Sequence, residues 1–237
     1  MKIRFLLSIL LIMLAVISTT LAYRPAYAYF DRMSSSAHET LTIGRWRDLR
    51  TLFFSDINLN DFVTRGPLNQ NSEGLTSSFG FFFIETNSES YVVTLVAQMS
   101  AGNNGGYGIV FDSTLDGNNH TGYIIQLDRG FGPGAVILRE WIDGSEQSSG
   151  SPLLVARANS TPGIPGRNQD PSWWTEEKTL RLEITKLNET QKSLTFFVDD
   201  VLVFENEVIE SSVPASELFV GFRAWGTSST FKSMTIE

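Results

Sequence analysis

Short apolar segments separated by turn-forming residues recur along the chain from residue 51 onward. Successive side chains of a strand point to opposite faces, so Leu180, Leu182 and Ile184 would share one face while Arg181 and Glu183 share the other. After the N-terminal segment, no window of about 11 residues keeps a helical period. Many short strands between Gly, Asn, Ser and Pro clusters are typical of a sandwich or barrel. We therefore predict an all-β fold, a two-sheet antiparallel jelly-roll β-sandwich.

The expected strands are bounded by these turn clusters, and a loop rich in Pro, Gly and Asn covers residues 159–171. One-turn helices are expected near residues 172–177 or 214–217. The predicted strands are residues 52–57, 78–85, 91–99, 107–111, 123–127, 135–141, 153–156, 179–186, 193–198, 201–205, 218–224 and 230–236.

The first 28 residues have the organisation of a secretory signal peptide. Lys2 and Arg4 precede an apolar stretch over residues 5–17, and Ala26-Tyr27-Ala28 offers the small residues that a signal peptidase reads. The apolar stretch is short compared with the roughly 20 residues of a bilayer span. We expect cleavage rather than retention as a membrane anchor, and therefore a secreted or cell-surface protein without stable membrane insertion.

This interpretation divides the chain into a signal peptide (1–28), an N-terminal linker or first strand (29–50) and a β-sandwich domain (51–237). The formal net charge of −8 would become more negative after cleavage, because residues 1–28 contain three basic residues and no acid. An acidic surface repels nucleic-acid phosphates and anionic lipid, so neither is an expected partner. The chain has no cysteine, so stability depends on a core, for which 17 phenylalanines are available.

The segment after the expected cleavage site resembles the start of exported camelysin and TasA-type proteins of Gram-positive bacteria. Ala28-Tyr29-Phe30-Asp31 and Leu41-Thr42-Ile43-Gly44 occupy the matching places, but His38 or Glu39 stands where those proteins usually have Asn. The resemblance implies an export route. An ordinary signal peptide followed by a flexible linker accounts for the same residues.

Five motifs, in order and spacing, resemble concanavalin A-like lectin and glucanase domains, including laminin-G-like domains. The run FFVDDVLVF (196–204) is similar to their acidic hairpin, with Asp200 in place of the usual Gly. GGYGIVF (105–111) and GYIIQL (122–127) look like a strand pair, and VGFRAW (220–225) and FKSMTI (231–236) look like the last two strands. Such domains bind sugars, bind proteins or cleave glycans, and the fold does not choose among these.

A glycan-cleaving site would need two carboxylates on either side of the scissile bond. Concanavalin-like glucanases carry them on one strand, but here Glu140 and Asp143 would point to opposite faces, and Asp143-Gly144 is better interpreted as a turn. The two histidines, His38 and His120, are not near a serine–acid pattern, which argues against a hydrolytic triad. The sequence identifies no catalytic residue.

Residues 112–119 collect oxygen ligands in one expected loop, which makes calcium the candidate cofactor. Asp112, Asp116, Asn118 and Asn119 are the candidate ligands. Calcium binds six to eight oxygens, and loops rich in Asp and Asn can supply part of that number. The same residue types also form ordinary turns.

Sugar-binding sites combine aromatic rings, which stack on the apolar faces of sugar rings, with polar side chains that bond the hydroxyl groups. The alternative for each tryptophan is a place in the core, where large aromatic side chains are common. The candidate ligand-binding residues are Tyr107, Arg129, Arg139, Trp141, Trp173 and Trp174, with Trp225 as a further aromatic candidate.

The favoured hypothesis is a non-catalytic binding module for polysaccharide or a cell-surface glycan or protein, with a matrix or adhesion role. The alternative is a glycan-active hydrolase on the same fold, whose catalytic carboxylates the sequence does not identify. A third hypothesis, suggested only by the leader, is a fibre-forming matrix subunit.

Overall fold

A computed structural model describes residues 50–237, except 87, 103, 118, 148–150 and 212. The chain divides into two units, Met1–Gly44 and Arg45–Glu237, and all described residues belong to the second. The expected signal peptide and the camelysin-like leader lie outside the described residues. In the part that the structure describes, no helix is long and apolar enough to cross a membrane.

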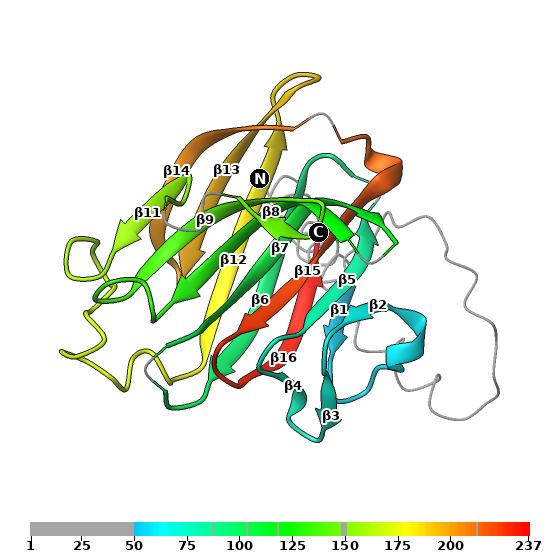
Figure 1. The fold of residues 1–237 in the computed structure, drawn as a ribbon. Helices are drawn as coiled ribbons and strands as arrows, with labels where there is room; N and C mark the ends of the chain where they lie inside the picture. The colour runs from blue at the N-terminus through cyan, green and yellow to red at the C-terminus, as the bar shows by residue number, and fades with distance from the viewer. Residues whose placement is uncertain (1–49, 87, 103, 118, 148–150, 212) are drawn as a thin grey trace, which may run out of the picture. The chain divides into compact units, whose positions relative to one another are not determined.

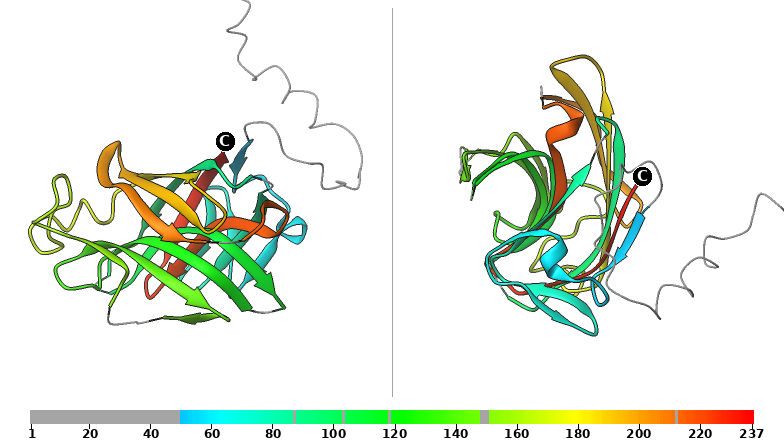
Figure 2. Two further views of the ribbon diagram at one scale, coloured as in Figure 1. Left: turned by 90° about the horizontal axis from the view of Figure 1, so that it is seen from above. Right: turned by 90° about the vertical axis from the view of Figure 1, so that its right-hand side faces the viewer.

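The described residues form two antiparallel sheets of eight strands each, which we name sheet A and sheet B. The two curled sheets form separate layers in Figure 2, and Figure 1 labels their strands. The predicted antiparallel β-sandwich is confirmed. Sheet A has the order β14-β13-β12-β6-β16-β4-β3, with β1 paired to β16. Its strands are β1 (Arg50–Phe53), β3 (Asn69–Asn71), β4 (Gly74–Ser77), β6 (Tyr91–Met99), β12 (Lys178–Lys186), β13 (Gln191–Val198), β14 (Val201–Glu210) and β16 (Ser229–Ile236).

Sheet B has the order β10-β9-β8-β7-β15-β5-β2, with β11 paired to β9. Two 3₁₀ turns, η2 (Leu59–Asp61) and η3 (Ala215–Glu217), lie in the connections. The strands of sheet B are β2 (Val63–Arg65), β5 (Phe81–Thr86), β7 (Gly106–Asp116), β8 (Asn119–Asp128), β9 (Ala135–Ile142), β10 (Ser145–Glu146), β11 (Leu154–Arg157) and β15 (Leu218–Trp225).

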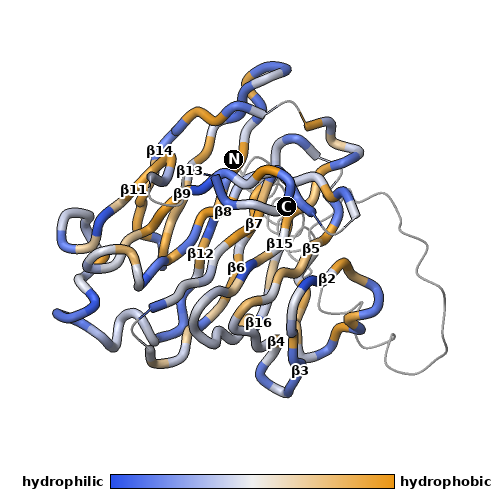
Figure 3. Tube along the Cα trace, in the orientation of Figure 1, coloured by the Kyte–Doolittle hydropathy of each residue, from blue (hydrophilic) through white to orange (hydrophobic). Residues whose placement is uncertain are grey.

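Phenylalanine rings fill the space between the sheets. Phe82 and Phe222 stack with their centroids 5.1 Å apart, Phe54 contacts both edge-on, and Phe231 stacks on Phe222. All four side chains are fully buried. Hydrophobic positions in Figure 3 are concentrated along the strands. Because such rings each bury a large apolar area, they provide the core that a chain without disulfides requires.

Several strand predictions are confirmed closely. The expected strand 91–99 coincides with β6, and Leu180, Leu182 and Ile184 of β12 are all buried. The acidic hairpin turn also forms as expected, with φ of 49° at Asp199 and 63° at Asp200. Asp tolerates this left-handed conformation better than most residues do.

Other boundaries were wrong. The expected strand 78–85 corresponds to β5, which begins only at Phe81, and β1 ends at Phe53 rather than at residue 57. The short strands β2, β3, β4 and β10 were not predicted, because segments of two to four residues are too short to show a period. The expected turn at 214–217 is η3, whereas residues 172–177 contain turns and no helix.

The interpretation of residues 112–119 as a loop between strands was also wrong. Strand β7 continues to Asp116 and β8 begins at Asn119, so most of this segment belongs to a long hairpin. Asp112 adopts a φ of 49° at an irregularity in the β7–β8 pairing. A polar stretch can remain in a strand when its backbone pairs with a neighbour, and polarity alone had marked it as a loop.

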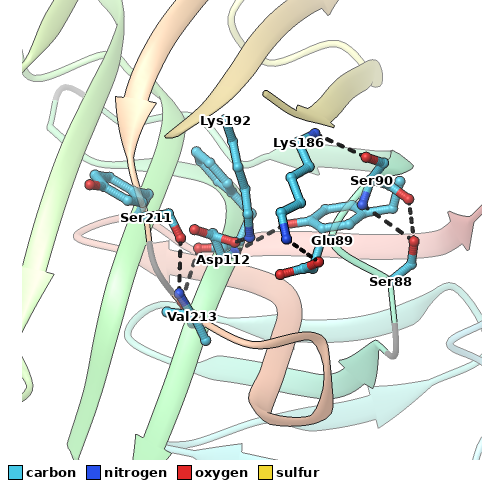
Figure 4. A network of polar contacts seen from close by, with 12 residues as sticks. Ser88, Glu89, Ser90, Asp112, Lys186, Lys192, Ser211 and Val213 are labelled. Carbon is cyan, nitrogen blue, oxygen red and sulfur yellow. Dashed lines mark hydrogen bonds and ion pairs between the residues drawn. The ribbon is translucent and has the colours of Figure 1, made fainter. Parts of the chain in front are cut away.

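One buried ion pair joins the two sheets. The Nζ of Lys192, on β13 of sheet A, contacts Oδ1 of Asp112, on β7 of sheet B, and both side chains are almost completely buried. Figure 4 shows the two side chains pointing toward each other. The backbone N–H of Asp112 donates to the hydroxyl oxygen of Tyr91 over 3.1 Å. Two charges in such a place are tolerated only as a pair.

We expect Lys192→Met to lower the free energy of unfolding by about 3–5 kcal/mol, because it leaves the Asp112 carboxylate buried without a counter-charge. The double variant Lys192→Met, Asp112→Asn has no charge there, and Asn also tolerates the left-handed conformation. It should regain at least half of the loss. Urea unfolding at pH 7 measures both; a single variant as stable as the parent would contradict the expected cost.

Candidate functional site

The outward face of sheet B, which points away from the core, carries an unusual set of side chains. In β5 the alternation sends Phe82 and Ile84 inward and Phe81 and Phe83 outward. Strand register places Phe81 opposite Arg223, Arg223 opposite Gly108, and Gly108 opposite Gln126. One row across four strands therefore presents an aromatic ring, a guanidinium group and an amide.

Two glycines on this face allow the sheet to bend. A Cβ at Gly221 would lie 1.8 Å from the carbonyl oxygen of Phe82, and a Cβ at Gly108 would lie 2.0 Å from that of Ile125. No side chain fits at either position, so the neighbouring strands lean over the outward side of the sheet. Val110 and Ile124 point away from the core between the sheets but are buried, in a cluster with Phe83 that Phe81, Trp141 and Phe219 pack against.

A connected set of polar side chains lies on the same face. Glu146, on the edge strand β10, pairs with Arg139 at 2.8 Å and with Arg223 at 3.6 Å. Nη1 of Arg223 donates to Oε1 of Gln126, and Nε2 of Gln126 donates to Oδ2 of Asp128. We call these five residues the outer-face network. Because most of them are buried, their orientations are fixed before any ligand arrives.

Burial and neighbouring groups shift the pKa values of two residues of the outer-face network, Arg223 and Asp128. Burial lowers the pKa of Arg223 to about 10, against the charges of Glu146 and Asp128, so this side chain is protonated at neutral pH. Burial raises the pKa of Asp128, and the hydrogen bond from Gln126 and those from the N–H groups of Gly130 and Phe131 oppose that shift. Asp128 thus fixes the start of the β8–β9 loop.

Aromatic rings border the outer-face network. The guanidinium group of Arg223 lies 4.7 Å from the ring centroid of Trp141 and within 6.0 Å of those of Phe81 and Trp225. All three rings are only partly buried. Within the described residues, the indole N–H groups of Trp141 and Trp225 and Nε of Arg223 have no hydrogen-bond acceptor. Unpaired buried donors are unusual in folded proteins and call for an acceptor.

The structure brings two of the predicted binding residues together, Arg139 and Trp141, and both belong to this face. Arg129 directly follows Asp128 in the β8–β9 loop, and its Nε and Nη1 have no acceptor among the described residues. Nη1 of Arg167 donates to the backbone carbonyl of Arg129 over 2.8 Å. Arg129 therefore lies next in sequence to the outer-face network, in a loop beside a second guanidinium group.

The other predicted aromatic residues lie elsewhere. Tyr107 is fully buried in the core, with its ring edge-on to Phe231. Trp174 is also buried, its ring packs against Gly134, and its N–H donates to the carbonyl of Pro165. Tyr107 and Trp174 are therefore core residues, buried away from solvent.

Trp173 is partly buried and lies edge-on to Trp174, under the Nζ of Lys178 at 4.6 Å. It is packed against the core cluster between the sheets. The tryptophan pair therefore belongs to the core between the sheets and its margin, whereas Trp141 packs against the outward-facing cluster of sheet B.

The candidate calcium ligands are not gathered around one point. Asp112 is buried against Lys192, whereas Asp116 and Asn119 face each other at the exposed end of the β7–β8 hairpin. Nη2 of Arg65 donates to the carbonyls of Gly117 and Asn119, so a guanidinium group already occupies oxygens that a cation would use. Asn118 lies outside the described residues. Across those residues, no group of three or more His, Asp or Glu side chains could hold a metal ion.

Sequence reasoning missed Phe81, Gln126, Asp128, Glu146 and Arg223 as site residues. The expected turn at Asp143-Gly144 does form, with φ of 50° and 74° at the two residues. A signal was present: Gln126 and Asp128 are polar at alternate positions of an apolar strand. Such a pattern indicates a second, polar face, but not which strand lies beside it.

No family model matches the chain, and no curated protein matches it. Solved structures with a similar fold include the carbohydrate-binding module CBM66 from Bacillus subtilis (18% identity, TM-score 0.50, covering 72% of this chain and 91% of that one). The Emp46p carbohydrate recognition domain is another (12%, 0.54, 78% and 94%). A third is the VIP36 exoplasmic/lumenal domain with Ca²⁺ and Man3GlcNAc (13%, 0.53, 81% and 90%). At these identities the likeness shows the fold alone.

His120 makes the stability of this face depend on pH. Its ring stacks on Trp141 at 4.8 Å, and burial, then the charges of Arg65 and Arg223, lower its pKa from 6.5 to about 4. Between about pH 6.5 and pH 4, His120 is protonated in the unfolded chain but still neutral in the folded protein. Lowering the pH through this window should therefore decrease the free energy of unfolding, by up to about 1.4 kcal/mol per pH unit.

Replacing His120 with Phe keeps an aromatic ring and removes the titration. The stability difference between the parent protein and His120→Phe, measured by denaturant unfolding at several pH values, should change between pH 6.5 and 4 and stay constant above pH 7. Parallel curves throughout would show that His120 does not carry this dependence.

Proposed function

We propose that the protein binds carbohydrate through the outward face of sheet B. The observation that carries this proposal is the convergence of partly exposed aromatic rings, Trp141, Trp225 and Phe81, with the fixed polar groups of the outer-face network. Sugars present apolar C–H surfaces between hydroxyl groups, and this face offers both kinds of partner within a few ångströms. Binding sites in general combine aromatic walls with a few oriented polar groups.

The unpaired donors support the same proposal. Each buried N–H without an acceptor costs about 1–3 kcal/mol, and among the residues that the structure describes, Trp141, Trp225 and Arg223 each have one. Oxygens of a ligand or of water would remove that cost. The carbohydrate-binding modules and lectins with this fold give independent support for the class of ligand.

Binding accounts for the carboxylates better than hydrolysis does. Glu146 forms ion pairs with two guanidinium groups, and Asp128 accepts hydrogen bonds from two backbone N–H groups and an amide. Both carboxylates are engaged by groups of the protein itself, an arrangement that fixes the positions of the surrounding donors. A hydrolase would need one carboxyl group to donate a proton to the leaving oxygen. We therefore keep the binding function as our proposal, in a protein whose expected signal peptide would export it.

Glycan microarray screening of the purified protein, followed by calorimetry with the best ligand, tests this function. Trp141→Ala should weaken binding at least about tenfold, equivalent to about 1.4 kcal/mol, because it removes a ring from the proposed contact surface. Circular dichroism and thermal unfolding of the variant would verify that the sandwich is retained.

Trp173→Ala is the matched variant, since it truncates another partly buried tryptophan outside this face. It should leave the affinity within about twofold. Loss of binding in Trp173→Ala with no change in Trp141→Ala would move the site to the tryptophan pair. A protein that binds no glycan would contradict the proposed function.

A further inference from the structure

We propose that the sugar bound at this face carries a carboxylate, as a uronic acid does, and that arginine side chains recognise it. This inference rests on the proposed function and specifies the class of glycan. It requires a local positive charge, a guanidinium group open to solvent, and a geometry that suits a planar anion.

Positive charge gathers at this face although the chain as a whole has a net charge of −8. Arg139 and Arg223 lie on the face itself, and Arg65 on the adjoining strand β2 points its guanidinium toward the ring of Phe83. Only two acids, Asp128 and Glu146, belong to the outer-face network. The acidic protein as a whole would repel an anionic polymer, but these arginines create a region where an anion is attracted.

The β8–β9 loop extends the positive region. The ring of Phe131 has the guanidinium groups of Arg139 and Arg157 at 5.8 and 5.4 Å from its centroid. Arg129 lies in this loop, and Arg167 contacts its backbone carbonyl. The pKa of Arg129 is lowered by burial and by the charge of Arg167. A ligand anion would relieve this repulsion between like charges.

Arg157 is the guanidinium group most open to a ligand. Its side chain is exposed at the end of edge strand β11, and it makes no ion pair with any acid among the described residues. Its ring contact with Phe131 holds the planar group against the surface, as cation–π contacts do. An arginine placed in this way can offer two parallel N–H groups to one carboxylate.

The arginines of this face already bind one carboxylate, that of Glu146. Its two oxygens are shared between Arg139 and Arg223, at 2.8 and 3.6 Å. After this internal pairing, Nε of Arg223 and two nitrogens of Arg129 still have no acceptor in the described part of the chain. A second carboxylate, carried by a ligand, would supply acceptors for these nitrogens.

The test compares two ligands that differ only in charge: an oligogalacturonide, and the same oligomer with its carboxyl groups reduced to alcohols. Calorimetry of the full protein should show the acidic oligomer binding at least about tenfold more tightly at low salt. The preference should shrink as the salt concentration rises. Arg157→Gln should lower the affinity for the acidic oligomer at least about fivefold and leave that for the reduced oligomer unchanged.

Arg181→Gln is the matched control. Like Arg157, Arg181 contacts an aromatic ring, that of Phe197, but it pairs with Glu183 and lies on sheet A. Its replacement removes the same charge and should not change the affinity. Equal effects of Arg157→Gln and Arg181→Gln would reduce the result to net charge and overturn the inference.

The remaining outcomes separate the two proposals. Equal binding of both oligomers, or preference for a neutral glycan, would overturn the carboxylate assignment and leave carbohydrate binding intact. Tighter binding of a sulfated, carboxyl-free oligomer would also overturn it, in favour of another anion. Failure to bind any oligomer or any glycan on the array would contradict the proposed function itself.

Discussion

The close approach of strands at Gly108 and Gly221 is the constraint on which the outward face of sheet B depends. A side chain at either position would meet a neighbouring backbone oxygen, so only glycine permits the bend. The bend brings the side chains of β5, β15, β8 and β9 together over a surface that would otherwise be open to solvent. Apolar residues beneath them, such as Val110 and Ile124, are then shielded without any further layer of structure.

Shielding also explains why the polar side chains of this face are ordered. Arg223 would be a mobile surface residue on a flat sheet, but here it lies among three aromatic rings, donates a hydrogen bond to Gln126 and forms an ion pair with Glu146. Its charge persists despite burial because an acid accompanies it. A rigid polar surface of this kind loses little conformational entropy on binding, which favours selectivity for ligands that match its donors.

The fold was largely predictable because it follows from local alternation, as in β6 and β12, and from the turn chemistry of Asp199 and Asp200. The site was predictable only in part. Arg139 and Trp141 come from one strand with a clear pattern. Their partners Arg223 and Phe81 come from strands far away in sequence, and the sequence of a strand does not specify which residues of a distant strand lie opposite it. Trp174 shows the opposite problem: a loop position suggested exposure, whereas Gly134 leaves room for its ring inside the protein. Asp112 was misplaced because its partner, Lys192, is 80 residues away.

The tie between Asp112 and Lys192 has a consequence for the surroundings in which the protein can work. Exported domains often fasten their sheets with a covalent bridge between cysteines, which a reducing agent can open. This chain holds one end of its sandwich with a charge pair inside the protein, which reductants do not attack and dissolved ions barely screen. The Asp112–Lys192 ion pair should therefore stabilise the sandwich equally in oxidising and reducing media, and at high and low salt concentration.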